Sequence, residues 1–132
     1  MKIVYIDTSA FLKLVVAEPE SSEFRAWLRG REWTSSVLLR IEAERGASRH
    51  TEAALHSTRK WLERINLIRL SSQIVDMARR VEPPSLRTLD AIHLATALHL
   101  GRDLVSMVTY DRKLAEAARA LAINVPELFA AE

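Results

Sequence analysis

The stretch KIVYIDTSA, residues 2–10, decides the fold of this chain. Residues 3–6 form an unbroken run of β-branched and aromatic side chains, which is typical of a strand buried on both faces of a parallel sheet. Asp7 follows at the carboxyl end of that strand, where open α/β sheets place their ligand crevice. Two interpretations stay open: Asp7, Thr8 or Ser9 caps the next helix, or Asp7 belongs to a functional site.

The same order, a strand followed by a helix, continues along the chain. Beyond residues 3–6 we predict strands at residues 33–36, 66–70 and 104–109, and a last short strand around 123–125. Strands that alternate with helices predict βαβ units, and therefore a three-layer α/β/α domain with a mainly parallel central sheet of four or five strands. The predicted helices cover residues 9–17 (ended by Glu18-Pro19), 21–30, 37–48, 51–64, 72–81, 88–100 and 111–121.

Length and composition fit one domain. A chain of 132 residues can bury a core but is too short for two ordinary domains, so we expect a single domain over residues 1–132. The absence of cysteine excludes disulfides and thiolate metal sites and favours the cytoplasm. The first apolar run is too short for a signal peptide or a membrane span. With only three glycines, the chain also lacks a glycine-rich phosphate loop.

Four acids occupy equivalent places in this pattern. Asp7 and Asp111 follow predicted strands, whereas Glu42 and Asp90 lie in the opening turns of predicted helices. We therefore expect all four at the carboxyl edge of the sheet. Carboxylates held together repel one another unless a cation neutralises them. A site made only of oxygen ligands suits Mg²⁺ or Mn²⁺, and such a site can hydrolyse phosphodiesters.

Each acid also has a purely structural interpretation. Asp111 is well placed as a helix N-cap, and Glu42, three residues before Arg45, could form an ordinary helical ion pair. Asp90 lies in an otherwise apolar segment, where an unpartnered carboxylate is costly to bury, so capping and function both stay open. His93, one turn later, has the spacing of a metal ligand, although a histidine hydrogen-bonded inside an alanine-rich helix is the commoner arrangement.

Four segments carry a family resemblance. They read KIVYIDTSAFLKL, SSVLLRIEAERGASR, SLRTLDAIHLATALHLG and LVSMVTYDRKLAEAA in chain order. They resemble the successive signature motifs of the PIN domain, and especially of the VapC ribonuclease toxins of type II toxin–antitoxin systems. The resemblance implies a catalytic and metal-binding set of Asp7, Glu42, Asp90 and Asp111. The register of SSVLLRIE favours Glu42 over its rival Glu44.

The resemblance assigns two supporting hydroxyls, and basic residues beside the acids suggest an RNA-binding rim. Ser9 and Thr109 correspond to hydroxyls that support the metal waters or the acids. Arg87 and Arg112 could hold RNA phosphates at the rim of the site, or could be solvated charges at helix ends. The family often has a Gly-Leu-x-Val turn after its last helix, where this chain has Ala122 in place of the glycine. We expect that change to cost little.

The implied function is that of a magnesium-dependent endoribonuclease toxin. The resemblance implies a homodimer, neutralised by a cognate antitoxin whose C-terminal segment lies across the toxin and blocks the acidic site. The helix with Phe24 and Trp27 and the helix with Trp61 are candidate interface surfaces. Three alternatives stay open: a PIN nuclease in RNA maturation without an antitoxin, a structure-specific DNA nuclease, and a PIN-like scaffold that binds RNA without cutting it. Retention of all four acids argues against the scaffold.

Overall fold

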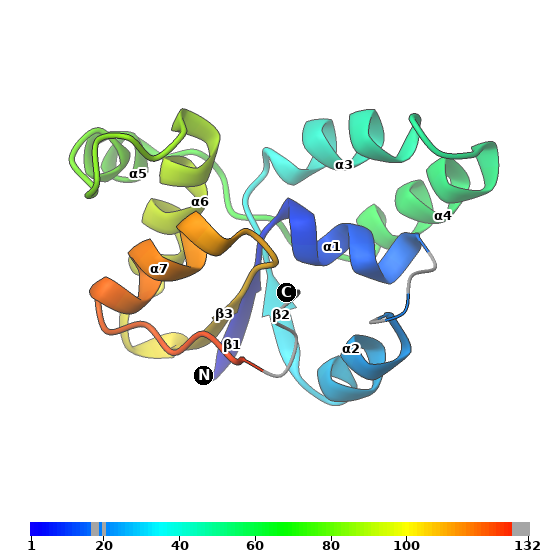
Figure 1. The fold of residues 1–132 in the computed structure, drawn as a ribbon, viewed down its shortest axis with the longest axis horizontal. Coiled ribbons are helices and arrows are strands. Elements are labelled where there is room, and N and C mark those ends of the chain that lie inside the picture. The colour runs from blue at the N-terminus through cyan, green and yellow to red at the C-terminus, as the bar shows by residue number, and fades with distance from the viewer. Residues whose placement is uncertain (17–18, 20, 128–132) are drawn as a thin grey trace.

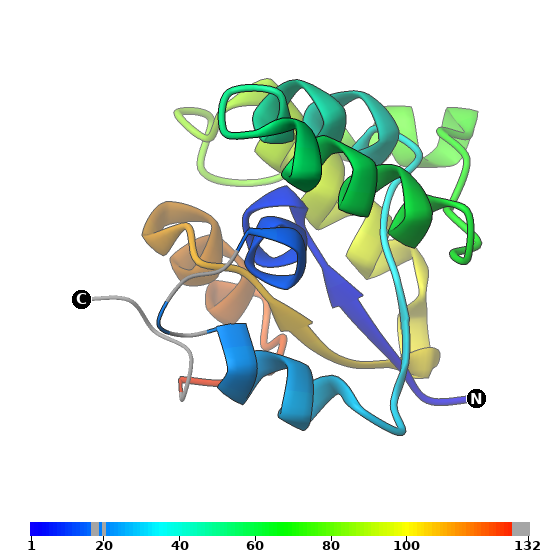
Figure 2. The ribbon, with the colours of Figure 1, turned by 90° about the vertical axis from the view of Figure 1, so that its right-hand side faces the viewer.

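The computed structural model describes residues 1–16, 19 and 21–127. In this part of the chain the sheet has three strands, β1 (Ile3–Ile6), β2 (Glu32–Thr34) and β3 (Leu104–Val108). They pair in parallel in the order β2-β1-β3, so β1 is the central strand. Figure 2 shows β1 and β3 running in the same direction. The predicted parallel sheet around residues 3–6 is confirmed.

Every predicted helix is present among the described residues. The end of the first predicted helix at residue 17, and Glu18 of the Glu18-Pro19 break, lie outside them. The helices are α1 (Thr8–Val15), α2 (Ser21–Leu28), α3 (Leu39–Ala47), α4 (Glu52–Leu62), α5 (Ser72–Ala78), α6 (Thr88–His99) and α7 (Arg112–Ala120), with a 3-10 turn, η1 (Gly101–Asp103), before β3. These helices all fall short of the length and apolar character that a membrane span requires.

The predicted number of four or five strands is wrong for the described residues. The segment at residues 66–70 contributes only one isolated parallel bridge, between Ser36 and Ile68. The segment around residues 123–125 contributes a backbone hydrogen bond from Met107 N to Asn124 O (2.9 Å). Both segments contain β-branched apolar residues, but a ladder needs successive paired residues, and pairing stops here after a single position.

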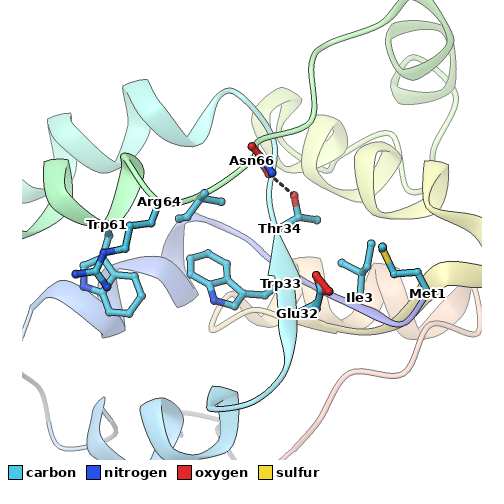
Figure 3. Close-up of a pocket in the computed structure, with 9 residues that line it drawn as sticks. Met1, Ile3, Glu32, Trp33, Thr34, Trp61, Arg64 and Asn66 are labelled. Carbon is cyan, nitrogen blue, oxygen red and sulfur yellow. Dashed lines mark hydrogen bonds between the residues drawn. The ribbon is translucent and has the colours of Figure 1, made fainter.

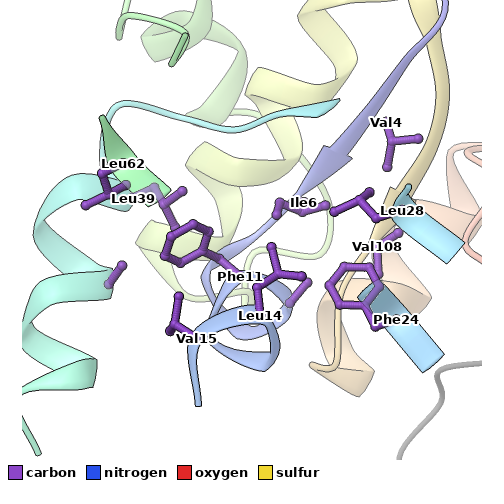
Figure 4. Close-up of a cluster of buried hydrophobic side chains, with 12 residues drawn as sticks. Val4, Ile6, Phe11, Leu14, Val15, Phe24, Leu28, Leu39, Leu62 and Val108 are labelled. Atoms are coloured by element: carbon purple, nitrogen blue, oxygen red, sulfur yellow. The ribbon is translucent and has the colours of Figure 1, made fainter. Parts of the chain in front are cut away.

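The core lies on both faces of the sheet, because successive side chains of β1 point in opposite directions. Val4 and Ile6 pack with residues of α1 to α4, whereas Tyr5 packs with residues of α6 and α7. Figure 4 shows the first cluster, in which Phe11 and Phe24 are fully buried. Figure 1 shows α1 to α4 on one side of the strands and α5 to α7 on the other. The three-layer α/β/α class is confirmed.

Two details refine the sequence interpretation. Ala122 has a φ of 64°, in the left-handed region that costs a residue with a Cβ roughly 1–2 kcal/mol. The replacement of glycine there is therefore less neutral than expected.

The candidate interface helices α2 and α4 also contribute to the core. Phe24 on α2 is buried in it, and Trp27 on α2 and Trp61 on α4 are half-buried against the same cluster. The interface roles of these two helices stay predictions.

The amino ends of the strands form a surface of their own. Ile3 and Glu32, which begin β1 and β2, line a cavity of about 530 Å³ together with Trp33 and Trp61. Figure 3 shows these side chains around the edge of β2. Because all three strands are parallel, this cavity lies at the end of the sheet away from Asp7. It is not the site that the acids predict.

Candidate active site

Asp7 directly follows β1 and is the N-cap of α1. It is 3% exposed. Its Oδ1 accepts hydrogen bonds from Ala10 N (2.9 Å) and Ser9 Oγ (2.7 Å), and its Oδ2 accepts one from Thr109 Oγ1 (2.5 Å). Burial raises the pKa of the Asp7 carboxyl, and His93 and these donors offset the effect only in part. Asp7 therefore caps a helix and also holds a carboxylate that is costly to ionise.

Thr109 joins Asp7 to Asp111. Thr109 follows β3 directly, and its hydroxyl accepts a hydrogen bond from Asp111 N (3.0 Å) while donating to Asp7. Asp111 is the N-cap of α7, where its Oδ1 accepts from Leu114 N (3.0 Å). Ser9 Oγ also accepts from Tyr110 N (2.8 Å). The two predicted supporting hydroxyls thus bind the loops that follow β1 and β3 to each other.

Glu42 reaches the same edge from the first turn of α3. Its Oε1 accepts hydrogen bonds from Thr8 Oγ1 (2.7 Å) and His93 Nε2 (2.9 Å). Burial alone would raise the pKa of Glu42, but these two donors hold it below its usual value. The ion pair with Arg45 does not form among the described residues, whereas the rival Glu44 pairs with Arg59 at 3.3 Å.

Asp90 lies half-buried in the first turn of α6. Its helix is capped by Arg87 without a side-chain hydrogen bond. Burial raises the pKa of Asp90, and the charges of Asp111, Asp7 and Glu42 raise it further, against a lowering by His93. Asp90 therefore experiences the other three acids at once, and the four side chains from four elements share one electrostatic neighbourhood.

The acids fit a divalent cation in their chemistry. Among the described residues no lysine or arginine forms an ion pair with any of the four, so their repulsion is not neutralised by protein charge. Four carboxylates form an all-oxygen donor set, which suits Mg²⁺ or Mn²⁺. In the described part of the chain no three His, Cys, Asp or Glu side chains already lie at coordinating distance. Side-chain rotation would have to complete such a site.

The surface around the acids carries both basic and apolar side chains. Arg87 and Arg112 are exposed at the first turns of the helices that carry Asp90 and Asp111, and neither contacts an acid in the described residues. Their RNA-binding role stays a prediction. Beside Glu42, a cavity of about 470 Å³ is lined by apolar and basic side chains. Ile41 and Leu89 at this cavity are 62% and 47% exposed.

The expected arrangement of His93, hydrogen-bonded inside its helix rather than free to bind a metal, is confirmed, but the sequence did not reveal Tyr5 and Thr8 as partners of the site. The structure shows His93 1% exposed and hydrogen-bonded to both Tyr5 and Glu42. The one signal in the sequence was a polar side chain inside an otherwise apolar helix, one turn after Asp90. Its partners lie 88 and 51 positions away, beyond the reach of any local pattern.

Comparisons with known proteins agree with this fold. The PIN domain family model matches residues 4–120. Ribonuclease VapC46 of Mycobacterium tuberculosis is 43% identical over 126 residues, which cover 95% of this chain and 97% of that protein.

Two solved structures share the architecture. DNA-bound VapBC from Salmonella typhimurium aligns with a TM-score of 0.69 at 19% identity, covering 96% of this chain and 98% of that chain. A toxin–antitoxin complex from Klebsiella pneumoniae aligns with a TM-score of 0.61 at 24% identity, covering 83% and 88%. These two structures show the fold alone. The match to the PIN domain model and the 43% identity to ribonuclease VapC46 show that this chain belongs to the PIN-domain family, within its VapC group.

Proposed function

We propose that this protein is a metal-dependent endoribonuclease, the toxin of a type II toxin–antitoxin pair, and that Asp7, Glu42, Asp90 and Asp111 form its active site. The observation that carries the proposal is the environment of Asp90, whose pKa is raised by burial and by all three other acids. No basic side chain in the described residues neutralises the group. A bound cation is the simplest partner for such a set of charges.

The proposed cofactor is Mg²⁺, with Mn²⁺ as the alternative. Bound among the acids, the ion would supply the Lewis acidity that makes water nucleophilic and stabilises charge on phosphoryl oxygens. Asp7 would present a carboxylate whose two oxygens are already oriented by Ser9 and Thr109. Asp90 would present a carboxylate with no competing hydrogen-bond donor among the described residues.

The substrate side of the proposal rests on charge. All four acids lie at or within the first turn of a helix, where the positive end of the helix dipole and free N–H groups favour anions. These helix ends would favour RNA phosphates once a cation had neutralised the acids. Arg87 and Arg112, exposed at two of the same helix ends, are proposed to hold flanking phosphates.

The partner proposals come from family membership. The curated relative is named a ribonuclease VapC, and we propose a cognate antitoxin, a homodimer, a single PIN domain over residues 1–132 and a cytoplasmic location. The cavity beside Glu42, with Ile41 and Leu89 exposed at its edge, could receive an apolar antitoxin segment that blocks the acids. The structural neighbours support only the fold, because their sequence identity is low.

Cleavage of RNA by the purified protein, freed of any antitoxin, tests the proposal. We expect cleavage in Mg²⁺ and none in excess chelator. Asp7→Asn and Asp90→Asn should each lower the rate at least about 100-fold, the usual effect of losing one electrostatic stabiliser. Asp103→Asn is the matched control and should cleave like the parent, because Asp103 lies half-buried in η1 and pairs with the amino terminus rather than with the acids.

The substrate range separates the alternatives. Cleavage of DNA but not RNA would favour the DNA nuclease, and RNA binding without cleavage would favour the scaffold. Metal-dependent cleavage that is unchanged in both variants would reject the site assignment.

A further inference from the structure

A chain of buried hydrogen bonds leads from the core to the acids. Tyr5 OH lies 2.7 Å from His93 Nδ1, and His93 Nε2 lies 2.9 Å from Glu42 Oε1. Tyr5 is 0% and His93 is 1% exposed. The three residues come from β1, α6 and α3 in that order. The chain of hydrogen bonds therefore starts in the sheet, passes through the helix layer that contains α6 and ends at Glu42 on the acidic edge.

Hydrogen-bond chemistry fixes the direction of this chain. A carboxylate only accepts, so the proton between His93 and Glu42 belongs to Nε2. In the neutral ring Nδ1 is then an acceptor, and the Tyr5 hydroxyl donates to it. Tyr5 thereby selects the tautomer that Glu42 requires, in the way that hydrogen-bond partners of metal ligands fix the orientation of those ligands.

Both donors to Glu42 bind the same oxygen. Oε1 accepts from His93 and from Thr8 (2.7 Å), whereas no donor to Oε2 is found in the described part of the chain. One side of the carboxylate is therefore fixed and the other is left for a cation or its water. His93 itself is unsuited to bind a metal, because both of its nitrogens already have partners and its side chain is closed to solvent.

We propose that His93 is a positioning residue that, together with Tyr5, holds Glu42 Oε1 so that Oε2 faces the cation site. The role of Glu42 toward a cation rests on the proposed function, but the orientation of Glu42 does not. Burying a phenol and an imidazole in an apolar core is costly unless each is hydrogen-bonded. Here Tyr5 and His93 bond to each other, and His93 also bonds to Glu42. An apolar pair would pack equally well without aligning the acid.

Calorimetric titration of Mn²⁺ into the purified protein, without RNA, tests the effect on the cation. His93→Leu removes the donor at similar size and should weaken Mn²⁺ binding by about 10- to 100-fold, the usual range when a residue that hydrogen-bonds a metal ligand is lost. His93→Gln keeps an N–H near the position of Nε2 and should recover most of the affinity. Tyr5→Phe should weaken binding by a smaller factor. His99→Leu, an exposed site on the same helix, should bind like the parent.

Nitrogen NMR of the histidine rings in the metal-free parent tests the orientation itself. We expect a proton on His93 Nε2 that is protected from exchange with solvent, and loss of that protection in Tyr5→Phe. A parent ring without a proton on Nε2 would overturn the proposal. So would parent-like Mn²⁺ affinity in folded His93→Leu or, if that variant does not fold, in Tyr5→Phe.

The two readouts also separate this proposal from the proposed function. If the parent binds no Mn²⁺ but shows the protected Nε2 proton, the cation site fails while the positioning of Glu42 stands. If the parent binds Mn²⁺ and the proton is absent, the positioning fails while the cation site stands.

Discussion

Asp90 is held at the acidic edge without a hydrogen-bond donor among the described residues. Asp7, by contrast, accepts hydrogen bonds from Ala10, Ser9 and Thr109. The two acids share a raised pKa, but only Asp7 also stabilises the fold through its contacts. A substitution at Asp90 therefore separates electrostatic repulsion from structural support.

Asp90→Asn should leave the metal-free protein at least as stable as the parent at pH 7. The raised pKa of Asp90 means that its ionised form destabilises the folded state, and stability linked to a raised pKa is lost as the pH rises through that pKa. Any advantage of the variant should therefore shrink as the pH falls from 7 toward 3.8, the unperturbed value. Chemical denaturation in chelator measures both. A loss near 1 kcal/mol, typical of a removed helix cap, would instead show that Asp90 supports α6.

Ala122→Gly should stabilise the protein. The φ of 64° at this position is costly for alanine but not for glycine, and the gain should be about 1 kcal/mol after the greater chain entropy of glycine is counted. Thermal unfolding would show a melting temperature several degrees higher. RNA cleavage should not change, since the turn after α7 does not contact the acids. An unchanged or lower melting temperature would mean that the turn is not strained.

At the scale of elements, capping and site chemistry coincide. Sequence interpretation set a helix cap against a functional acid at Asp7 and Asp111, and the structure shows that both side chains do cap their helices, α1 and α7. Placing acids at helix N-termini brings the positive ends of several helices to one edge. Those dipoles partly offset the repulsion among the carboxylates before any cation binds.

Asp111→Asn and Asp111→Ala should separate the two roles. Asparagine caps a helix as well as aspartate, so Asp111→Asn should keep its stability but lose cleavage, whereas Asp111→Ala should also lose about 1 kcal/mol. Thr51, the N-cap of α4, accepts from Ala54 N at 2.9 Å. Thr51→Ala should lose a similar amount of stability yet cleave like the parent. Full cleavage by Asp111→Asn would leave Asp111 with the capping role alone.

The sequence predicts helices of this fold better than strands. Apolar spacing and flanking turns located α1 to α7, because each helix buries its own stripe of side chains. Strand identity depends on a partner: Glu32 pairs with Ile3 and enters β2, although it is polar and lay outside the predicted strand. Ile68 is apolar and lay inside a predicted strand, but it forms only a bridge with Ser36.

At the scale of the whole molecule, the sequence predicted the order of the four acids but not the hydrogen bonds that hold them. Parallel strands and the helices that follow them account for Asp7, Glu42 and Asp111 at one edge, whereas Asp90 lies on α6, which follows α5 rather than a strand. The contact between Glu42 and His93 depends on how two helices from different parts of the chain pack. Such packing leaves no periodic trace in the sequence.

Induced expression of this chain alone should arrest growth, and coexpression with its proposed antitoxin should restore it. Ile41→Glu should weaken antitoxin binding and therefore the rescue, because it puts a charge into the cavity beside Glu42. The fold should tolerate the change, since the Ile41 side chain is already 62% exposed. Leu70→Glu, at another exposed apolar position (40%), is the control. Absence of growth arrest would refute the toxin role but not the nuclease.

Anomalous scattering from crystals soaked in Mn²⁺ tests the central claim most directly. We predict a peak bound by the carboxylates of Asp7 and Asp90, with Asp111 and Glu42 close enough to contact it directly or through water, and no such peak in Asp90→Asn. Oxygen ligands at roughly 2.0–2.2 Å would identify a hard-cation site. A parent crystal with no manganese at this edge, or with manganese bound only elsewhere, would contradict the account.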